Sequence, residues 1–208
     1  MTINTKTLAA IDIGTNAIRL FISNVEEYPT ETLFKKIAFL RVPIRLGEDV
    51  FTTGEIGQQK GKRLCETMQG FSYIMSAFNV ESYKAYATCA MREARNGKSV
   101  AEQIQKECDL NIEIISGTKE AETIFAGGMN EVVDDDKTYL YVDVGGGSTE
   151  VIVYSKSVKV EACSFPLGTV RMLNDAMDKE EMKHFKKWLK NITEKYTPDA
   201  IIGSGGNI

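Results

Sequence analysis

The stretch "YLYVDVGGGSTEVIVY", residues 139–154, contains two short apolar strands separated by a turn with almost no side chains. Residues 139–144 and 151–154 are rich in β-branched and aromatic side chains, which favour strands. Three glycines, a serine and a threonine lie between them, and Asp143 interrupts the first apolar run. A glycine-rich turn lets the backbone approach a ligand and point its N–H groups at it, but one such hairpin by itself is more often purely structural.

The same pattern occurs once before, near the amino terminus. "AAIDIGTNAIRLFI" aligns with "LYVDVGGGSTEVIV" without a gap when Asp12 is placed on Asp143. Two such turns together would bind phosphate oxygens, and the two aspartates would hold a hydrated Mg²⁺, because hard oxygen ligands suit that ion. The alternative is structural: many glycine-rich hairpins bind nothing, and an aspartate at the end of a strand can simply cap its turn.

The composition indicates an ordinary globular protein and argues against several kinds of site. The chain has 208 residues, of which 43% are apolar and 26% charged, enough for one large or two small domains. Its four cysteines are scattered, which indicates reduced thiols rather than zinc, and its one histidine, His184, argues against histidine-based catalysis. The net charge of −4 argues against duplex nucleic acid as a partner. A polar start and the lack of a long apolar run predict a cytoplasmic protein without a membrane partner.

Strand and helix patterns alternate along the chain in two similar series. The first series consists of strands at 8–14, 17–25 and 35–47, a helix at 55–78, a strand at 82–90, a helix at 99–110, a strand at 111–117 and a helix at 119–130. The second series consists of strands at 139–144, 151–154 and 157–165, a helix at 179–196 and a strand at 199–206. Two successive β-β-β-α-β units predict an α/β fold with a duplicated core, in domains 1–124 and 125–208.

This paired pattern resembles the actin, sugar kinase and Hsp70 superfamily, a ribonuclease H-like α/β fold with two phosphate-binding hairpins at a cleft between duplicated domains. A set of stretches spanning nearly the whole chain resembles, more narrowly, the Ppx/GppA family of exopolyphosphatases and guanosine pentaphosphate phosphohydrolases. These stretches are "AIDIGTNAIRLFI", "ATCAMREARNG", "IEIISGTKEAETIFAG", "VDVGGGSTEVIV", "SFPLGTVRM" and "IIGSGGNI". The resemblance implies Mg²⁺-dependent release of terminal phosphate from polyphosphate or guanosine pentaphosphate. A homodimer is compatible with it.

The resemblance also assigns roles to individual residues. The residues that match the two phosphate-binding loops are Gly14, Thr15, Asn16, Gly145, Gly146, Gly147 and Ser148. Asp12 and Asp143 match the carboxylates on the metal side, and Glu150 matches a glutamate that helps to hold the metal or a water. Arg92 matches an arginine that reaches the phosphate chain. Without the resemblance, an ordinary salt bridge at the start of a helix would be the simpler interpretation of Arg92.

One glutamate distinguishes a phosphatase from a kinase in this family. The family usually has two adjacent acids in the stretch that reads "ISGTKEAE" here, and the second acts as the base on the attacking water. Lys119 replaces the first acid, Glu120 keeps the second, and the effect of the lysine on its neighbour stays open. A carboxylate can orient water for in-line attack. The alternative is that Glu120 only complements the dipole of its helix.

The last stretch, "IIGSGGNI", resembles a glycine pair on the nucleotide side of the cleft. We therefore expect the second unit to be incomplete and the chain to be a fragment or an engineered piece of a longer protein. Two other functions stay open beside the exophosphatase. One is a small-molecule kinase of the same fold, and the other is a non-catalytic protein that binds polyphosphate or an alarmone and regulates a partner. The sequence does not decide between polyphosphate and guanosine pentaphosphate.

Overall fold

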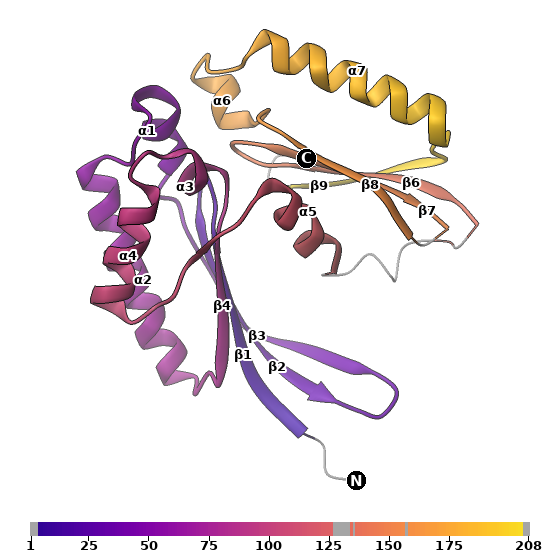
Figure 1. Cartoon of the computed structure of the whole chain (residues 1–208). Helices are drawn as coiled ribbons and strands as arrows, with labels where there is room; N and C mark the ends of the chain where they lie inside the picture. The colour runs from indigo at the N-terminus through magenta and orange to yellow at the C-terminus, as the bar shows by residue number, and fades with distance from the viewer. Residues whose placement is uncertain (1–3, 127–133, 135, 157, 206–208) are drawn as a thin grey trace. The chain divides into compact units, whose positions relative to one another are not determined.

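The computed structural model describes residues 4–126, 134, 136–156 and 158–205. It divides into two compact units, Met1–Ile114 and Ile115–Ile208, each built around its own sheet (Figure 1). The strand order is β3-β2-β1-β4-β5 in the first sheet and β8-β7-β6-β9 in the second. Both sheets begin with three antiparallel strands and add a parallel strand beside the first, so the expected duplicated α/β fold is confirmed.

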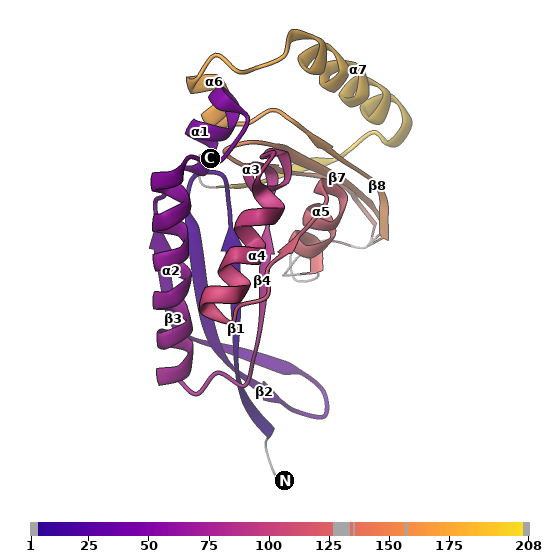
Figure 2. The ribbon, with the colours of Figure 1, turned by 60° about the vertical axis from the view of Figure 1, so that its left-hand side comes forward.

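The first unit places its longer helices on one face of its sheet. Its elements are β1 (Asn4–Ile13), β2 (Ile18–Glu27), β3 (Thr32–Val42), α1 (Leu46–Thr53), α2 (Gln58–Ala77), β4 (Ser82–Ala87), α3 (Cys89–Glu93), α4 (Gly97–Cys108) and β5 (Glu113–Ile114). Figure 2 shows α2 and α4 side by side against the sheet, and these two helices are in contact. The opposite face of the strands is therefore free of these helices, and it carries every second side chain.

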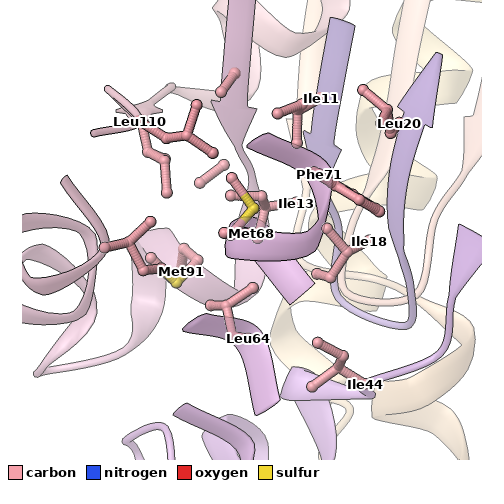
Figure 3. Packing of buried hydrophobic residues seen from close by; sticks show 14 of the residues in the cluster. Ile11, Ile13, Ile18, Leu20, Ile44, Leu64, Met68, Phe71, Met91 and Leu110 are labelled. Carbon is pink, nitrogen blue, oxygen red and sulfur yellow. The ribbon is translucent and has the colours of Figure 1, made fainter. Parts of the chain in front are cut away.

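The core of the first unit explains why α2 forms where the apolar period predicts it. Leu64, Met68 and Phe71 recur at helical spacing and are almost fully buried. They pack against Ile11 and Ile18 from the first two strands (Figure 3). Burying each such side chain contributes about 1.5–3 kcal/mol, so this layer fixes the position of β1 and of the turn that follows it.

The second unit has helices on both faces of its sheet. Its elements are α5 (Gly117–Ala126), β6 (Thr138–Val144), β7 (Thr149–Ser155), β8 (Val158–Phe165), α6 (Thr169–Leu173), α7 (Lys179–Tyr196) and β9 (Ala200–Gly205). Tyr139 and Tyr141 pack with Ala121 of α5, whereas Leu140 packs with residues of α7 on the other face. Because both faces are covered, β6 is apolar along most of its length, and Asp143 is the one charged residue within it.

Several expectations need correction in detail. Strand β3 ends at Val42 rather than at residue 47, because Pro43 cannot donate to a strand ladder. The strand expected at 111–117 shortens to Glu113–Ile114. Helix α5 contacts β7 and β8, and the two compact units divide between Ile114 and Ile115.

Three short helices, α1, α3 and α6, were not predicted. Residues 127–130, which were expected to continue α5, lie outside the described residues. Among the described residues, no helix is both long and apolar enough to cross a membrane.

Candidate functional site

The two glycine-rich turns have the same backbone geometry. In the first, Gly14 N donates to Ala17 O over 3.2 Å, and in the second, Gly145 N donates to Ser148 O over 2.9 Å. A Cβ atom on Gly14 would lie 3.1 Å from Ala17 O, and one on Gly145 would lie 3.0 Å from Ser148 O. Both glycines therefore sit where a side chain would crowd the turn, and the gap-free alignment of the two hairpins is a structural correspondence.

The first loop is held by the start of α1. Thr15 O accepts a hydrogen bond from Gly47 N over 3.0 Å, and Asn16 O accepts one from Arg45 N over 2.9 Å. In a trans peptide the carbonyl and the following N–H point in opposite directions, so the amides of Asn16 and Ala17 point away from α1. In the part of the chain that the structure describes, neither amide has an acceptor.

The second loop is held in the same way by the start of α6. Gly145 O accepts from Thr169 N over 3.1 Å, and Gly146 O accepts from Val170 N over 2.8 Å. The amides of Gly146, Gly147 and Ser148 have no acceptor among the described residues. Successive backbone amides that point the same way form a concave site for anions.

The first unit brings its predicted site residues to one edge of its sheet. Strands β1 and β4 are parallel, and Thr88 N donates to Ile13 O at their carboxyl ends over 3.2 Å. Asp12 and the first loop lie at the end of β1, and Arg92 lies in α3, just after the end of β4. Arg92 is half-buried. The carboxyl edge of parallel strands is the usual place for a ligand in an α/β sheet.

A row of charged side chains crosses the first sheet beside its loop. Asp12 lies opposite Arg19 on β2, and Arg19 lies opposite Arg41 on β3. On the other side, Asp12 pairs in register with Tyr86 of β4. Arg19 Nη1 donates to Asp12 Oδ2 over 2.8 Å, and both side chains are about two-fifths exposed, at 42% and 41%. The row thus combines one carboxylate with two guanidinium groups.

The equivalent row of the second sheet is acidic. Asp143 lies opposite Glu150 on β7, and Glu150 lies opposite Ser164 on β8. Glu150 is only 1% exposed, and Ser164 Oγ donates to its Oε1 over 2.8 Å. Two carboxylates directly opposite each other repel in a sheet unless a proton or a cation reduces their charge. This arrangement fits a small divalent cation.

The charge of Asp143 is also felt by a neighbour on its strand. Burial raises the pKa of Tyr141, and the carboxylate of Asp143 raises it further, while a hydrogen bond with Ser204 opposes the increase. Ser204 lies opposite Asp143 on β9, so this edge of the second sheet is lined by polar oxygens from three strands.

Glu120 lies on the same face of the second sheet as the acidic row. It is half-buried in the first turn of α5, next to Ala121, which packs against Tyr139 and Tyr141. Asp143 and Glu150 share that face, because strand side chains alternate. Ser116 precedes the helix and caps it, accepting through its Oγ from Lys119 N over 3.1 Å. Lys119 itself is exposed.

Among the described residues, no group of three or more histidine, cysteine, aspartate or glutamate side chains is arranged to hold a metal. Mg²⁺ binds proteins through one or two carboxylates and keeps several waters, so a pair of acids is sufficient. Asp143 and Glu150 are such a pair. Asp12 belongs to the other compact unit, and its recorded ion pair is with Arg19.

Sequence reasoning missed the elements that hold the loops. Helices α1 and α6 and the buried Arg171 were not expected. The stretch "PIRLG" lies at the start of α1 and "PLG" lies directly before α6, in both cases after the third strand of the unit. That repeated leucine–glycine pair was the available signal. Arg19 could also have been found, because its position opposite Asp12 follows from the hairpin register.

The chain is similar to known proteins in sequence and in fold. The model of the Ppx/GppA phosphatase family matches residues 21–205. A bifunctional 3-dehydroquinate synthase/phosphatase of Fusobacterium nucleatum is 30% identical, over 95% of this chain and 32% of its own length. Exopolyphosphatase 1 of Mycobacterium tuberculosis is 26% identical, over 95% of this chain and 60% of its own length. A crystal structure of an exopolyphosphatase from Cytophaga hutchinsonii superposes with a TM-score of 0.83 at 26% identity, covering 95% of this chain and 66% of that one.

The chain spans only part of these proteins. It corresponds to about a third of the Fusobacterium relative and to three fifths of the Mycobacterium relative, at 32% and 60% of their lengths. The match to the family model, residues 21–205, contains the second loop, the acidic row and Glu120.

Proposed function

This chain belongs to the Ppx/GppA phosphatase family, and from that premise we propose that it hydrolyses the terminal phosphoanhydride bond of polyphosphate or guanosine pentaphosphate with Mg²⁺. The observation that carries the proposal is the matched pair of loops, each with backbone amides that have no acceptor in the described residues. Relatives named exopolyphosphatase support a phosphate chain as the substrate. We propose the cytoplasm as the location, on the scattered cysteines.

The loops bind phosphate oxygens in this proposal. The amides of Asn16 and Ala17 serve in the first loop, and those of Gly146, Gly147 and Ser148 serve in the second. Arg92 adds a planar, charged donor at the same edge as the first loop. Backbone amides and a single arginine bind a polyanion locally, so the acidic net charge of the chain is no obstacle.

Asp143 and Glu150 would hold Mg²⁺, because they are two hard oxygen donors on one face and repel each other without a cation. When bound, the ion would reduce the negative charge on the phosphate oxygens. Asp12 is the third candidate from the sequence. Since Arg19 already donates to its carboxylate, Asp12 would have to share that carboxylate between guanidinium and metal.

Glu120 would orient the attacking water and take its proton. The water oxygen forms the new bond to the terminal phosphorus, the phosphoanhydride bond breaks, and the leaving phosphate keeps the electron pair. A carboxylate on the same face as the acidic pair is well placed for this role, and it supports hydrolysis rather than transfer to another acceptor. General-base help of this kind is worth about 10²–10⁴-fold in rate.

Orthophosphate release by the native protein tests the proposal. We expect release from polyphosphate or guanosine pentaphosphate in Mg²⁺, without any added acceptor, and no release in EDTA. The variant Glu120→Gln, purified in the same way, identifies activity from a contaminating phosphatase. If neither compound yields orthophosphate in Mg²⁺, the proposal is wrong. Release that requires an acceptor hydroxyl would assign a kinase instead.

A further inference from the structure

Arg171 is a buried arginine that contacts the second loop directly. It is 8% exposed, and its Nε donates to Gly147 O over 2.6 Å. Residues 115–208 contain many lysines but no other arginine. A buried charge is weak evidence for stability, because desolvation offsets much of what its contacts contribute. One contact of this buried arginine is with the backbone of the second loop, so its effect on that loop can be argued from geometry.

Arg171 completes a set of three bonds from α6 to consecutive loop carbonyls. Thr169 N binds Gly145 O, Val170 N binds Gly146 O, and the side chain of Arg171 binds Gly147 O. The approach is close: a Cβ on Gly168 would lie 2.4 Å from Gly146 O. Helix α6 thus holds one side of the loop backbone along its whole length.

These bonds determine where the loop amides point. The carbonyl of Gly147 and the N–H of Ser148 belong to one planar trans peptide, so fixing the carbonyl aims the N–H in the opposite direction. Ser148 is 4% exposed, and its N–H has no acceptor among the described residues. Buried backbone N–H groups in folded proteins are nearly always paired with protein, water or a ligand, and a phosphate oxygen would fill that role here.

In the first loop, a backbone amide donates the hydrogen bond that Arg171 donates in the second loop. There the equivalent carbonyl, Asn16 O, is bound by Arg45 N from the start of α1. The second loop uses a guanidinium instead, which supplies the same hydrogen bond together with a positive charge beside the loop. Hydrogen bonds from charged donors are about twice as strong as neutral ones.

We propose that Arg171 is a positioning residue that aims the Ser148 amide at a phosphate oxygen of the substrate. The inference rests on the proposed function, and it goes beyond it by naming the side chain on which the second loop depends. It predicts that phosphate binding and turnover depend on the hydrogen-bond donor at position 171. Binding of Mg²⁺ by the acidic pair should not depend on that donor.

Three substitutions and one control test the inference in the native protein. Arg171→Met removes the donor, Arg171→Gln keeps a neutral donor, and Arg171→Lys keeps the charge. Lys190→Met on α7 removes an equal charge from an exposed site. The measurements are kcat and KM for polyphosphate, the Mg²⁺ concentration for half-maximal rate, the affinity for inorganic tripolyphosphate by calorimetry, and the melting curve.

In Arg171→Met we expect kcat/KM and tripolyphosphate affinity to fall about 10–100-fold, less than the ~10²–10³-fold for deleting an oxyanion donor, because the amide is still present. Arg171→Gln should recover about 10-fold of that loss, since its amide can donate to Gly147 O. The Mg²⁺ requirement and the Lys190→Met control should stay at wild-type values.

Other results overturn the inference, and they separate it from the proposed function. If the parent is active and Arg171→Met has wild-type kinetics, Arg171 is not a positioning residue. The proposed phosphatase activity would not be affected by that result. Loss of cooperative melting in all three variants would assign Arg171 to the fold. If the parent binds tripolyphosphate but releases no orthophosphate, the proposed function is wrong, and the calorimetry still tests Arg171. If the parent neither binds tripolyphosphate nor hydrolyses polyphosphate, both the inference on Arg171 and the proposed function are wrong.

Discussion

The two hairpins of this chain share a backbone and differ in charge. Each turn has the same glycine N–H bond, and each is held by a short helix that follows the third strand. Across the sheet, however, Asp12 faces Arg19 in the first unit, while Asp143 faces Glu150 in the second. The duplicated backbone therefore places similar amides in both turns, and we propose that the residue opposite each aspartate decides whether the neighbouring row binds an anion or a cation.

This difference suggests a division of work between the units. The first row has two arginines and suits phosphate oxygens, whereas the second row has two acids and suits a metal. Glu120 lies on the same face of the second sheet as Asp143 and Glu150. We therefore expect substitutions in the second unit to affect the chemical step and the metal, and substitutions in the first to affect substrate binding.

The largest expected effect comes from Glu120→Gln. If Glu120 deprotonates the attacking water, kcat should fall about 10²–10⁴-fold while KM changes little, because the interaction is used only in the transition state. Steady-state orthophosphate release measures both constants. Lys119→Glu, which restores the usual acidic pair of the family, is the control and should stay active. Near-normal kcat in Glu120→Gln would leave Glu120 as a dipole partner of α5, worth about 0.3–1 kcal/mol.

The two aspartates provide the most direct test of the comparison. Asp143→Asn should raise the Mg²⁺ concentration for half-maximal rate by more than about 100-fold, since it removes a direct ligand. Asp12→Asn should raise it by about 10–100-fold at most, the range for residues that act behind the ligands, because Arg19 already occupies its carboxylate. Mg²⁺ titrations of both variants give the answer. Equal shifts would mean that both aspartates hold the ion directly, as the sequence alone predicts.

The parts of this site that sequence predicts are local. The hairpins could be predicted because apolar strands and a glycine turn lie within a few residues of each other, and α7 because Asp178 caps its start by accepting from Glu180 N. The bounds of α7, Lys179–Tyr196, agree with the expected helix at 179–196.

The parts that were missed depend on contacts between distant residues. Helix α6 spans only Thr169–Leu173, too short for an apolar period, and it forms against loop carbonyls more than twenty positions earlier in the chain. Arg171 was missed for the same reason, because nothing in "GTVRM" shows that its side chain reaches Gly147.

A smaller effect is expected from the close approach of α6 to its loop. Gly168→Ala would place a Cβ against the backbone of Gly146, and overpacking of this kind costs about 1–3 kcal/mol of unfolding free energy. Urea unfolding measures the cost. Gly70→Ala is the matched control, because it lies inside α2 with nothing within 4 Å of the added atom. It should stabilise the protein by about 0.5–1 kcal/mol. A neutral Gly168→Ala would show that α6 can move without disturbing the loop.

The smallest expected effect concerns the ion pair in the first row. Arg19 and Asp12 form an ion pair in which both side chains are about two-fifths exposed, at 42% and 41%. Exposed pairs contribute about 0.2–1 kcal/mol, and salt screens them. Arg19→Met should therefore lower the unfolding free energy slightly at low ionic strength, and the difference from the parent should vanish near 1 M salt, where the screening length is about 3 Å.

Ser164→Ala is the counterpart in the second row, because Ser164 donates to Glu150, which is 1% exposed. Its cost should be about 1.5–3 kcal/mol and should change less with salt, since this part-buried hydrogen bond reaches a buried carboxylate that salt screens less than an exposed one. This cost exceeds that of Arg19→Met. The two variants should therefore differ both in the loss of unfolding free energy and in how much that loss depends on salt. Urea unfolding at both ionic strengths measures the four values. If salt weakens both effects equally, the acidic row is open to solvent. The contrast between a half-exposed ion pair in the first row and a buried Glu150 in the second would then be wrong.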